Sequence, residues 1–555
     1  MESKVATYEV SILDEQFTFK ETTCSKTVVV KAFEENKLVS KTRYGFISKE
    51  EVYARLKQGL DINLDRCYVK DFSISEYKKS IDFEDLTHIT LNNFSAQNAF
   101  FDCTLRTDFS YIDFKGEVKF KDTVFAHGNL SFYQCEFSDT VLEFRNVEFG
   151  RGEVSFQYVK FGNADVLFGS SKFYGGVVSF VNADFGDGNA SFNNVNFFNS
   201  KVKFHYASFG KGDVGFQKAK FGNQTVDFRK VEFGTGRVDF RRAVFGNGYI
   251  TFDESEISSG RINFRYARFG SNDMSFKLMH FGNADVFFEY VDFGTGGKVS
   301  FSECTAKRIS FKGSRLDVFL DLRVSNVKVI DLSETVLRDI IDMKPMDHDV
   351  HIKTLYLNGM RNLGRIIIDW KINSIKDLII SQTDTSLREK SEQFNNLKEN
   401  FDQSGQYEDE DEAYILFKRY ELAADFKDAI KSGGTSLLKL PAYAFRWLIF
   451  DKMGLYATSP LRVLFSMIII YVCFSFLYLL LPTLGVGNII NSVGATDGLS
   501  YLQTCFYHSA ITFLTIGYGD YYPTGFSRGI SIVEGWMGLF LMSYFTVAFV
   551  RKILR

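Results

Sequence analysis

Phenylalanines recur at a fixed interval through the middle of the chain. From Phe120 to Phe293 the gaps between them alternate between five and seven residues, so the pattern repeats every twelve residues, with Ile257 standing in once. Fifteen copies follow one another without an insertion, within residues 118–294. A short repeat kept over this length is typical of a solenoid, in which each unit buries its apolar side chains against its neighbours.

Each repeat contains short stretches of apolar–polar alternation, which predict β-strands. In the unit VSFQYVKFGNAD, Val154 and Phe156 point to one side, and Val159 and Phe161 form a second inward pair before Phe-Gly turns the corner. A coil of 24 residues would hold two units and four inward phenylalanines on four faces, and is favoured over a coil of 12 residues. The units resemble the pentapeptide repeat, so we predict a right-handed β-solenoid, or β-helix.

The solenoid is predicted to extend beyond the regular repeats, over residues 81–380. An irregular version of the pattern precedes the repeats, and looser units with apolar–polar alternation follow them. Residues 1–80 are predicted to form an N-terminal α/β cap region, with strand-like stretches and one helix from Ser48 to Gln58. We assign no function to this region.

Two long apolar runs near the C-terminus predict membrane spans, at residues 462–482 and 530–550. The first contains nineteen residues without a charge, from Val463 to Leu481. At about 1.5 Å per residue such a helix matches the hydrocarbon thickness of a bilayer. The second run contains one acid, Glu534. A buried soluble helix is rarely this long and apolar, so a membrane protein is favoured.

Basic residues flank the two spans, whereas the loop between them holds only Arg528. The flanking residues are Arg446, Lys452 and Arg462 before the first span, and Arg551, Lys552 and Arg555 after the second. The positive-inside rule therefore predicts that both termini lie in the cytoplasm. The predicted location is the cell (plasma) membrane, as a multi-pass protein. No signal peptide is expected at the start of the chain, and the solenoid is expected to be cytosolic.

Between the spans, residues 501–513 form an apolar stretch too short to cross a bilayer, which predicts a re-entrant pore helix. The loop that follows resembles the selectivity filter of potassium channels, with isoleucine in place of the usual valine. The filter residues, 515–520, are Thr515, Ile516, Gly517, Tyr518, Gly519 and Asp520. The alternative is a glycine-rich turn in a membrane hairpin.

This resemblance implies a homotetramer, because four copies of the loop line one pore. Their backbone carbonyls replace the water around a K⁺ ion, and glycine tolerates the backbone angles that this requires, at Gly517 and Gly519. The Thr515 hydroxyl can add an inner ring of oxygens, and Tyr518 would pack outward and hold the ring open. Potassium is then the permeant ligand, and no cofactor is expected.

Residues beside the filter are candidates for supporting and gating it. We predict that Thr512 and Glu534 support the filter, since an acid inside a span is costly unless it is paired. The alternative for Glu534 is a carboxylate at the outer water interface. Gly535 and Gly538 are a candidate gating hinge, although glycines are also common in membrane helices for packing alone.

The chain between the solenoid and the pore is predicted to be helical. A cytosolic linker is predicted over residues 385–435, and its second helix opens with five acids, as favoured at a helix N-terminus. Residues 440–460 are predicted to form an amphipathic helix at the inner membrane surface, and the pore module to occupy 461–555. The run from Gln406 to Arg419 resembles the linker of bacterial channels that join pentapeptide repeats to a two-span pore.

Composition excludes several other function classes. The net charge of −3 gives no reason to expect a nucleic-acid partner, and the seven scattered cysteines lack a CxxC pair, as in reduced cytosolic proteins. No nucleophile–base pair or phosphate loop indicates an enzyme. A cluster in the late solenoid could hold a divalent ion but is interpreted as a solvated loop, so no metal other than permeating potassium is expected. Its members are Asp342, Asp347, His348, Asp349 and His351.

Together these patterns predict a multidomain chain with a β-solenoid, a helical linker and an α-helical two-span pore. The predicted function is a tetrameric potassium-selective ion channel, gated through the cytosolic solenoid by an unknown ligand or protein partner. No arginine-rich span is present, so no voltage sensor is predicted. The alternative is a membrane-anchored solenoid scaffold with a poorly conducting pore.

Overall fold

The computed structural model describes residues 6–20, 22–433, 438–492, 494 and 498–554. It divides into two compact units, Met1–Thr383 and Asp384–Arg555. Parts of three predicted regions lie outside the described residues: 1–5 and 21 in the cap region, 434–435 in the linker, and 493, 495–497 and 555 in the pore module.

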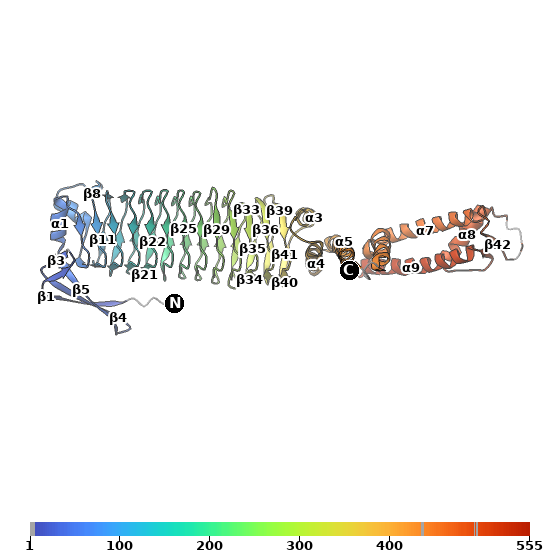
Figure 1. The fold of residues 1–555 in the computed structure, drawn as a ribbon, viewed down its shortest axis with the longest axis horizontal. Coiled ribbons are helices and arrows are strands. Elements are labelled where there is room, and N and C mark those ends of the chain that lie inside the picture. The colour runs from blue at the N-terminus through green and yellow to red at the C-terminus, as the bar shows by residue number, and fades with distance from the viewer. Residues whose placement is uncertain (1–5, 21, 434–437, 493, 495–497, 555) are drawn as a thin grey trace. The chain divides into compact units, whose positions relative to one another are not determined.

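The first unit is a β-solenoid whose coils stack along one axis between helix α1 (Lys49–Lys57) and helix α3 (Ile375–Ile380) (Figure 1). Two long parallel sheets run its length. One has 13 strands, from β6 (Ile62–Asn63) to β39 (His351–Tyr356), and the other has 12, from β11 (Arg106–Asp108) to β41 (Arg365–Ile367).

The other two faces begin as strands and continue as single bridges. One follows β10 (Phe100–Asp102), β14 (Val124–Phe125), β18 (Glu148–Phe149) and β21 (Lys172–Phe173). The same face ends with β34 (Arg315–Leu316), β37 (Val336–Leu337) and a last strand, β40 (Arg361–Asn362). The fourth face begins with β8 (Ile89–Leu91), β12 (Ile112–Phe114) and β16 (Glu136–Phe137).

The row of single bridges fixes the face on which the last of these strands lie. Lys172 pairs with Asn196, and the row continues in steps of one coil to Asp292, which pairs with Arg315. The strands β34, β37 and β40 (Arg361–Asn362) therefore continue the face of β21, while the row from Glu136 through Lys160 continues the face of β16. Each coil thus has four faces.

The strand register confirms the coil of 24 residues. Leu130 pairs with Val154 on one face, and Val226 pairs with Ile250 later in the same sheet, each exactly two repeats apart in sequence. In this register a phenylalanine meets the equivalent phenylalanine of the next coil, as Phe132 meets Phe156.

Stacked aromatic rings fill the solenoid. Phe156 stacks on Phe132 and on Phe180 with ring centroids 5.0 Å apart in both pairs, and the rings are within 3° of parallel. Inside the coil, Phe144 meets Phe156 edge to face at 5.7 Å. Both geometries are favourable for aromatic pairs, and these rings are fully buried. The prediction of four inward phenylalanines per coil is confirmed.

The corners differ from the prediction that Phe-Gly makes the turn. A left-handed residue recurs every twelve positions, two residues after the first phenylalanine of each unit, as at Tyr158 (φ 56°) and Asn182 (φ 55°). The glycines after the second phenylalanine are not all left-handed. Spacing between coils constrains a further glycine: a Cβ on Gly212 would lie 1.9 Å from the carbonyl oxygen of Gly188. That glycine is required because the coils approach closely.

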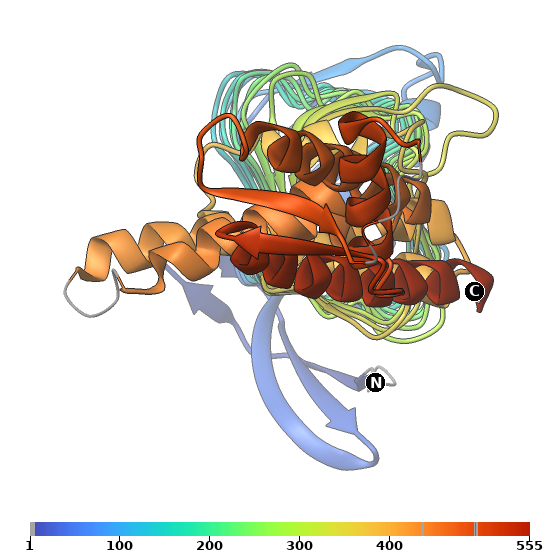
Figure 2. The ribbon, with the colours of Figure 1, turned by 90° about the vertical axis from the view of Figure 1, so that its right-hand side faces the viewer.

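The N-terminal region joins the solenoid earlier than predicted. Strands β1 (Thr7–Leu13), β4 (Thr27–Glu34) and β5 (Lys37–Ile47) form an antiparallel ribbon that extends away from the coils (Figure 2). Strand β6 already pairs with β9 (Phe94–Ser95), so the first coil begins near residue 62 and not at 81. Helix α2 (Ile74–Ser80) is inserted into this coil and hides the repeat in the sequence.

A helix ends the solenoid, where further coils had been predicted up to residue 380. The side chains of Ile375, Leu378 and Ile379 in α3 are buried at the end of the last coil. The helix covers the apolar end of the last coil, which would otherwise be exposed to water, as terminal caps do in other solenoids.

The second unit begins with a helical hairpin. Its helices are α4 (Leu387–Gln403) and α5 (Tyr407–Ser432). Ser386 caps α4 in a capping box with Glu389, and the α4 side chains of Phe394, Leu397 and Phe401 are buried. The spacing of these three residues places them on one face of the helix.

The predicted helix over 440–460 is confirmed from Leu440 to Met453 and is wrong beyond that residue. The segment forms α6 (Leu440–Phe445), a π-helix η2 (Arg446–Met453) and a short 3₁₀ turn η3 (Leu455–Ala457). The break follows from the backbone: Leu455, Tyr456 and Ala457 have φ of 45°, 55° and 62°, in the left-handed region that a right-handed helix cannot contain.

Two long apolar helices follow, α7 (Pro460–Leu480) and α9 (Ser527–Ile553). Both are long and apolar enough to cross a membrane. Most of their residues are exposed in the single chain, including Phe465, Ile469 and Trp536. Apolar surface of this extent is not solvated in a stable soluble protein, so it faces lipid or other chains.

Removal of one stacked ring should weaken the solenoid locally. Phe204 is fully buried and stacks on Phe180 and Phe228 at 4.7 and 4.9 Å. Phe204→Ala should lower the free energy of local opening by about 3–5 kcal/mol, because it removes the ring and leaves a cavity. Hydrogen exchange of the amides in the coils around residue 204 measures this.

The matched control for this change is Tyr158→Ala, which removes a ring of similar size from an exposed corner. We expect this change to lower the free energy of local opening by less than about 1 kcal/mol. Equal effects of the two changes would show that ring stacking does not stabilise the coils.

Candidate functional site

Helix α8 (Tyr501–Phe513) lies between the two long helices in the chain and carries the candidate filter at its C-terminal end. Ser500 accepts a hydrogen bond from the Gln503 amide, and the Gln503 side chain accepts one from the Ser500 amide, so a capping box fixes where the helix begins. With 13 residues, the helix is about 20 Å long and does not cross a bilayer.

The backbone after α8 alternates in handedness. Thr515, Gly517 and Gly519 have φ of 55°, 57° and 77°, whereas Ile516 and Tyr518 between them do not have positive φ. Alternation between left- and right-handed conformations turns successive carbonyl groups toward the same side of the chain. A Cβ on Gly517 or Gly519 would meet nothing within 4 Å, so conformation and not space requires glycine there.

The start of this loop is held by hydrogen bonds to α8. The amides of Ile516 and Gly517 both donate to the Ile511 carbonyl, at 2.8 and 3.1 Å. The Thr515 amide donates to the carbonyl of Thr512, which is how this predicted support residue reaches the loop. The Thr515 hydroxyl donates to the Leu514 carbonyl at 2.7 Å.

Asp520 is anchored at the other end of the loop. The Tyr507 hydroxyl, on α8, donates to the Asp520 carboxylate at 2.8 Å. The chain then continues into β43 (Tyr521–Gly525), which pairs antiparallel with β42 (Gly487–Asn491). Neither the Tyr507 contact nor this pair of strands was predicted from the sequence.

Tyr518 and Ile516 are exposed in the single chain. The exposed fractions of their side chains are 71% and 48%, and the rest of the loop from Thr515 to Gly519 is exposed as well.

Glu534 lies inside the second unit and has no exposed surface. Its carboxylate accepts hydrogen bonds from Ser509 on α8 and from Tyr478 on α7, the latter at 2.7 Å. The alternative of a carboxylate at the water interface is therefore wrong. The carboxylate contacts the pore helix and the first long helix, and not the filter loop, so its support of the loop is indirect.

Further polar groups extend this buried network. The Tyr478 and Ser531 hydroxyls are 2.9 Å apart, and the His508 ring nitrogen lies 3.0 Å from the Ser531 hydroxyl. Tyr478, Ser509 and His508 were not predicted from the sequence. Their signal was present: Ser531 and Glu534 are three residues apart on one face of a membrane helix, which calls for polar partners on its neighbours.

The two glycines proposed as a hinge lie in an unbroken part of α9. A Cβ on Gly538 would lie 2.0 Å from the Phe513 carbonyl oxygen, so this glycine allows α9 to pack against the end of the pore helix. A Cβ on Gly535 would meet only Thr512, at 3.9 Å. Packing explains Gly538, and the hinge stays a prediction.

The C-terminal end of α9 is paired with the acidic start of α5. The Arg551 guanidinium lies 3.0 Å from the Asp411 carboxylate and 3.2 Å from that of Glu410, and the Lys552 ammonium lies 2.8 Å from Asp411. The side chains of Glu410 and Asp411 are buried, and Arg551 also covers the Tyr414 ring at 4.6 Å. These four charged residues are called the latch below.

The latch joins a linker helix directly to the helix that follows the filter. Both runs of charge were visible in the sequence, but their 140-residue separation hid the pairing. Buried charges of this kind are stable only while they are paired, so the contact is specific.

The acidic and histidine cluster of the late solenoid does not form a metal centre in the structure. Asp342 accepts a hydrogen bond from the Lys344 amide, and His348 contacts the Arg323 carbonyl. Among the described residues, no group of three or more His, Cys, Asp or Glu side chains lies close enough together to hold a metal ion. This applies to Asp347, Asp349 and His351 as well.

Loss of the Glu534 carboxylate should destabilise the second unit. Glu534→Ala removes the acceptor of two buried hydroxyls, which are left with one other partner each: the Tyr471 carbonyl for Ser509 at 3.2 Å and the Ser531 hydroxyl for Tyr478 at 2.9 Å. The loss should cost about 1–3 kcal/mol in all. We expect a clear fall in Tm of the detergent-solubilised protein. Glu534→Gln keeps a side-chain acceptor, so its Tm should fall less. An equal Tm for the alanine variant and the unchanged protein would contradict the network's role.

The comparison with protein families agrees with this geometry. No curated protein matches the chain significantly. Residues 466–555 match the family model described as "Ion channel". This segment includes most of α7 and all of α8, the filter loop and α9. The C-terminal part of this membrane protein is therefore an ion channel domain, joined to a β-solenoid.

Proposed function

We propose that the chain forms a homotetrameric, potassium-selective channel. The observation that carries this proposal is the alternating backbone of residues 515–519, on a loop with the sequence Thr-Ile-Gly-Tyr-Gly-Asp inside an ion channel domain. Carbonyls directed to one side from four such loops can replace the hydration shell of K⁺.

Four copies supply what one chain lacks. In one chain the loop from Thr515 to Gly519 is exposed, and a single row of carbonyls offers too few oxygens to surround a dehydrated ion. Fourfold symmetry closes the ring, and Tyr518 then packs outward against its surroundings. Potassium is the permeant ion, and the pathway has no need of a resident cofactor.

The proposed location is the plasma membrane, with both ends of the chain and the solenoid in the cytoplasm. This orientation is supported by the basic residues that flank α7 and α9 and by the single Arg528 in the connecting loop. The solenoid would then meet a cytosolic ligand or protein, whose binding biases the pore between closed and open states.

The latch offers a physical route for that bias. Arg551 and Lys552 end the helix that follows the filter, and Glu410 and Asp411 begin the long helix of the linker. A displacement of α5 either carries the end of α9 with it or separates buried opposite charges, which is costly. The linker and the pore therefore move together.

Selectivity should depend on the left-handed glycine. Gly517→Ala places a Cβ in a conformation that costs about 1–2 kcal/mol per residue for an L-amino acid, so the carbonyl row should distort and lose its preference for K⁺. With K⁺ on one side of a planar bilayer and Na⁺ on the other, the unchanged channel should reverse near the K⁺ equilibrium potential, and the variant should reverse near zero.

Gly529→Ala is the matched control, because a Cβ there also meets nothing within 4 Å but the residue does not have positive φ. It should keep the reversal potential of the unchanged channel. Equal permeation of both ions through the unchanged channel would contradict potassium selectivity.

Charge reversal tests the latch. Asp411→Lys and Lys552→Asp should each shift the open probability several-fold, since each places like charges together in a partly buried site. The double variant restores opposite charges between positions 411 and 552, whereas Asp411→Lys still faces Arg551. The open probability should therefore return part of the way toward the original value, with a coupling free energy of about 0.5–3 kcal/mol. Single-channel recording of the three variants gives this cycle.

Lys427→Asp serves as the control, since Lys427 is exposed on the same helix and is not part of the latch. It should leave the open probability unchanged. Additive effects in the double variant would show that the latch does not couple the linker to the pore.

A further inference from the structure

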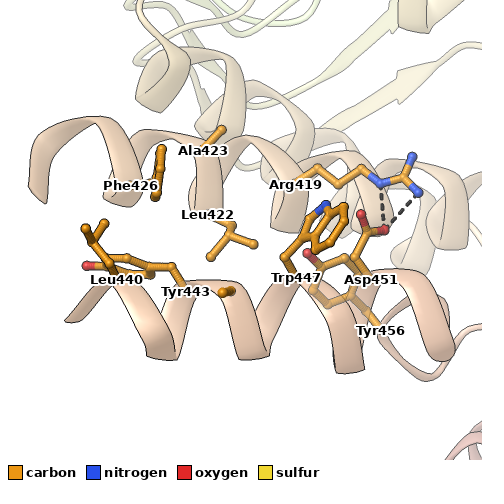
Figure 3. Close-up of a pocket in the computed structure, with 10 residues that line it drawn as sticks. Arg419, Leu422, Ala423, Phe426, Leu440, Tyr443, Trp447, Asp451 and Tyr456 are labelled. Carbon is orange, nitrogen blue, oxygen red and sulfur yellow. Dashed lines mark hydrogen bonds and ion pairs between the residues drawn. The ribbon is translucent and has the colours of Figure 1, made fainter. Parts of the chain in front are cut away.

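A cavity of about 480 Å³ lies between α5 and the segment formed by α6 and η2 (Figure 3). This volume is within the range of about 300–1,000 Å³ found for small-molecule sites. Leu422, Ala423 and Phe426 line it from α5, and Tyr443 and Trp447 line it from the opposite segment. We call it the linker pocket.

The ends and rim of the linker pocket are closed by specific contacts. At one end the Arg419 guanidinium pairs with Asp451 at 2.8 Å, and at the other the rings of Phe426 and Tyr443 meet edge to face at 6.4 Å. Along the rim, Arg446 lies within 4 Å of Glu421 and Asp425. The charged side chains at the pocket are thus paired with each other, and the rest of its lining is mainly apolar and aromatic.

One polar atom in the linker pocket has no partner. The Tyr456 hydroxyl is buried and makes no hydrogen bond with any residue that the structure describes. Burial raises the pKa of Tyr456 to about 12, so the phenol stays protonated at neutral pH and offers a hydrogen-bond donor. Leaving such a donor buried and unsatisfied costs about 1–3 kcal/mol.

Tyr456 is held there by a strained turn. It is the middle one of three successive left-handed residues, none of them glycine. Left-handed conformations of this kind cost of order 1–3 kcal/mol each and occur at ligand clamps and switch regions, where the surroundings hold them. An unsatisfied donor on a strained turn at the end of an apolar pocket indicates a bound group with a hydrogen-bond acceptor.

The surroundings of the linker pocket favour a membrane lipid as that group. Ala457 is only three residues from Pro460, where the membrane helix α7 begins. The side chains of Phe445, Trp447 and Leu448 on the same segment are about half exposed, as expected for a helix that lies in the membrane interface. Acyl chains and ester carbonyls are both present at that depth.

We propose that the linker pocket binds one acyl chain of a membrane phospholipid, with an ester carbonyl accepting the hydrogen bond from Tyr456. The aromatic and aliphatic walls hold the chain. This inference rests on the proposed function only for its membrane position and its effect on the pore.

The turn that holds Tyr456 also contacts the pore. The Ala457 amide donates to the Tyr544 hydroxyl on α9 at 2.8 Å, and a Cβ on Gly454 would lie 2.1 Å from the Tyr544 ring. The turn and α9 therefore fit closely together. A lipid that stabilises the turn also stabilises this position of α9, so its binding biases the open probability.

Tryptophan fluorescence tests the binding. The chain has three tryptophans, and Trp370→Phe with Trp536→Phe leaves Trp447 as the sole fluorophore. The full-length protein is reconstituted into phosphatidylcholine vesicles with a rising fraction of phosphatidylcholine brominated at mid-chain, which quenches on contact. Trp447 should be quenched, and Ala423→Phe, which fills the linker pocket, should reduce the quenching at least twofold.

Ala442→Phe is the matched control, because Ala442 is exposed on α6 but does not line the pocket. It should leave the quenching unchanged. Quenching that is equal in all three proteins would show that Trp447 meets only bulk lipid, and no quenching in the unchanged protein would show that no acyl chain binds. Either result overturns the proposal.

Tyr456→Phe separates a ligand role from a structural one. It should not lower the Tm in lipid-free detergent, and the Tm should rise, because the change removes a buried hydroxyl that has no partner. It should weaken the apparent affinity for the brominated lipid, measured by quenching, by roughly fivefold, the equivalent of about 1 kcal/mol. Unchanged quenching would remove the proposed hydrogen bond.

Single-channel recording of Ala423→Phe and Ala442→Phe completes the test. The first should shift the open probability and the second should not. Normal gating of Ala423→Phe despite its loss of quenching would overturn the coupling to α9. Because quenching needs no current, a failure of lipid binding and a failure of the channel function are distinguishable.

Discussion

Ring stacking between successive coils is the interaction on which the N-terminal unit depends. Each phenylalanine meets its equivalent 24 residues away, as Phe156 meets Phe132 and Phe180. The stacking fixes the number of residues in a coil and the four-faced cross-section, and it fixes which glycines are forced by the close approach of neighbouring coils. The outer side chains are then free to vary, so the same scaffold can carry a recognition surface without change to its core.

In the second unit, buried polar contacts take over the role that ring stacking has in the first. Glu534, Tyr478 and Ser509 come from three different helices and satisfy one another in the interior. Helices that cross a membrane have little hydrophobic drive to associate, so hydrogen bonds and close glycine packing, as at Gly538, fix their positions. The filter loop is short and exposed, and its conformation is held from behind by this arrangement and by α8.

Two contacts connect the linker to α9 at separate places. The latch pairs α5 with the end of α9 through charge, and the turn at 455–457 pairs with Tyr544 through a hydrogen bond and close packing. The linker pocket lies between α5 and the segment that leads to this turn. A signal that moves α5 and a ligand that occupies the pocket would thus act on the same helix, which allows the two inputs to reinforce or oppose each other.

The sequence by itself determined whatever depends on local periodicity. The twelve-residue spacing of phenylalanine predicted the solenoid and its coil, because a coil buries its own repeat. The lengths and apolarity of residues 462–482 and 530–550 predicted two membrane helices, and the spacing of Gly517 and Gly519 predicted the special backbone of the filter. Only the tertiary structure decided what depends on distant partners. It showed that Glu534 bonds Ser509 and Tyr478, that the acids of α5 meet Arg551, and that residues 440–460 break at a left-handed turn, because each of these is fixed by packing against a segment far away in the chain.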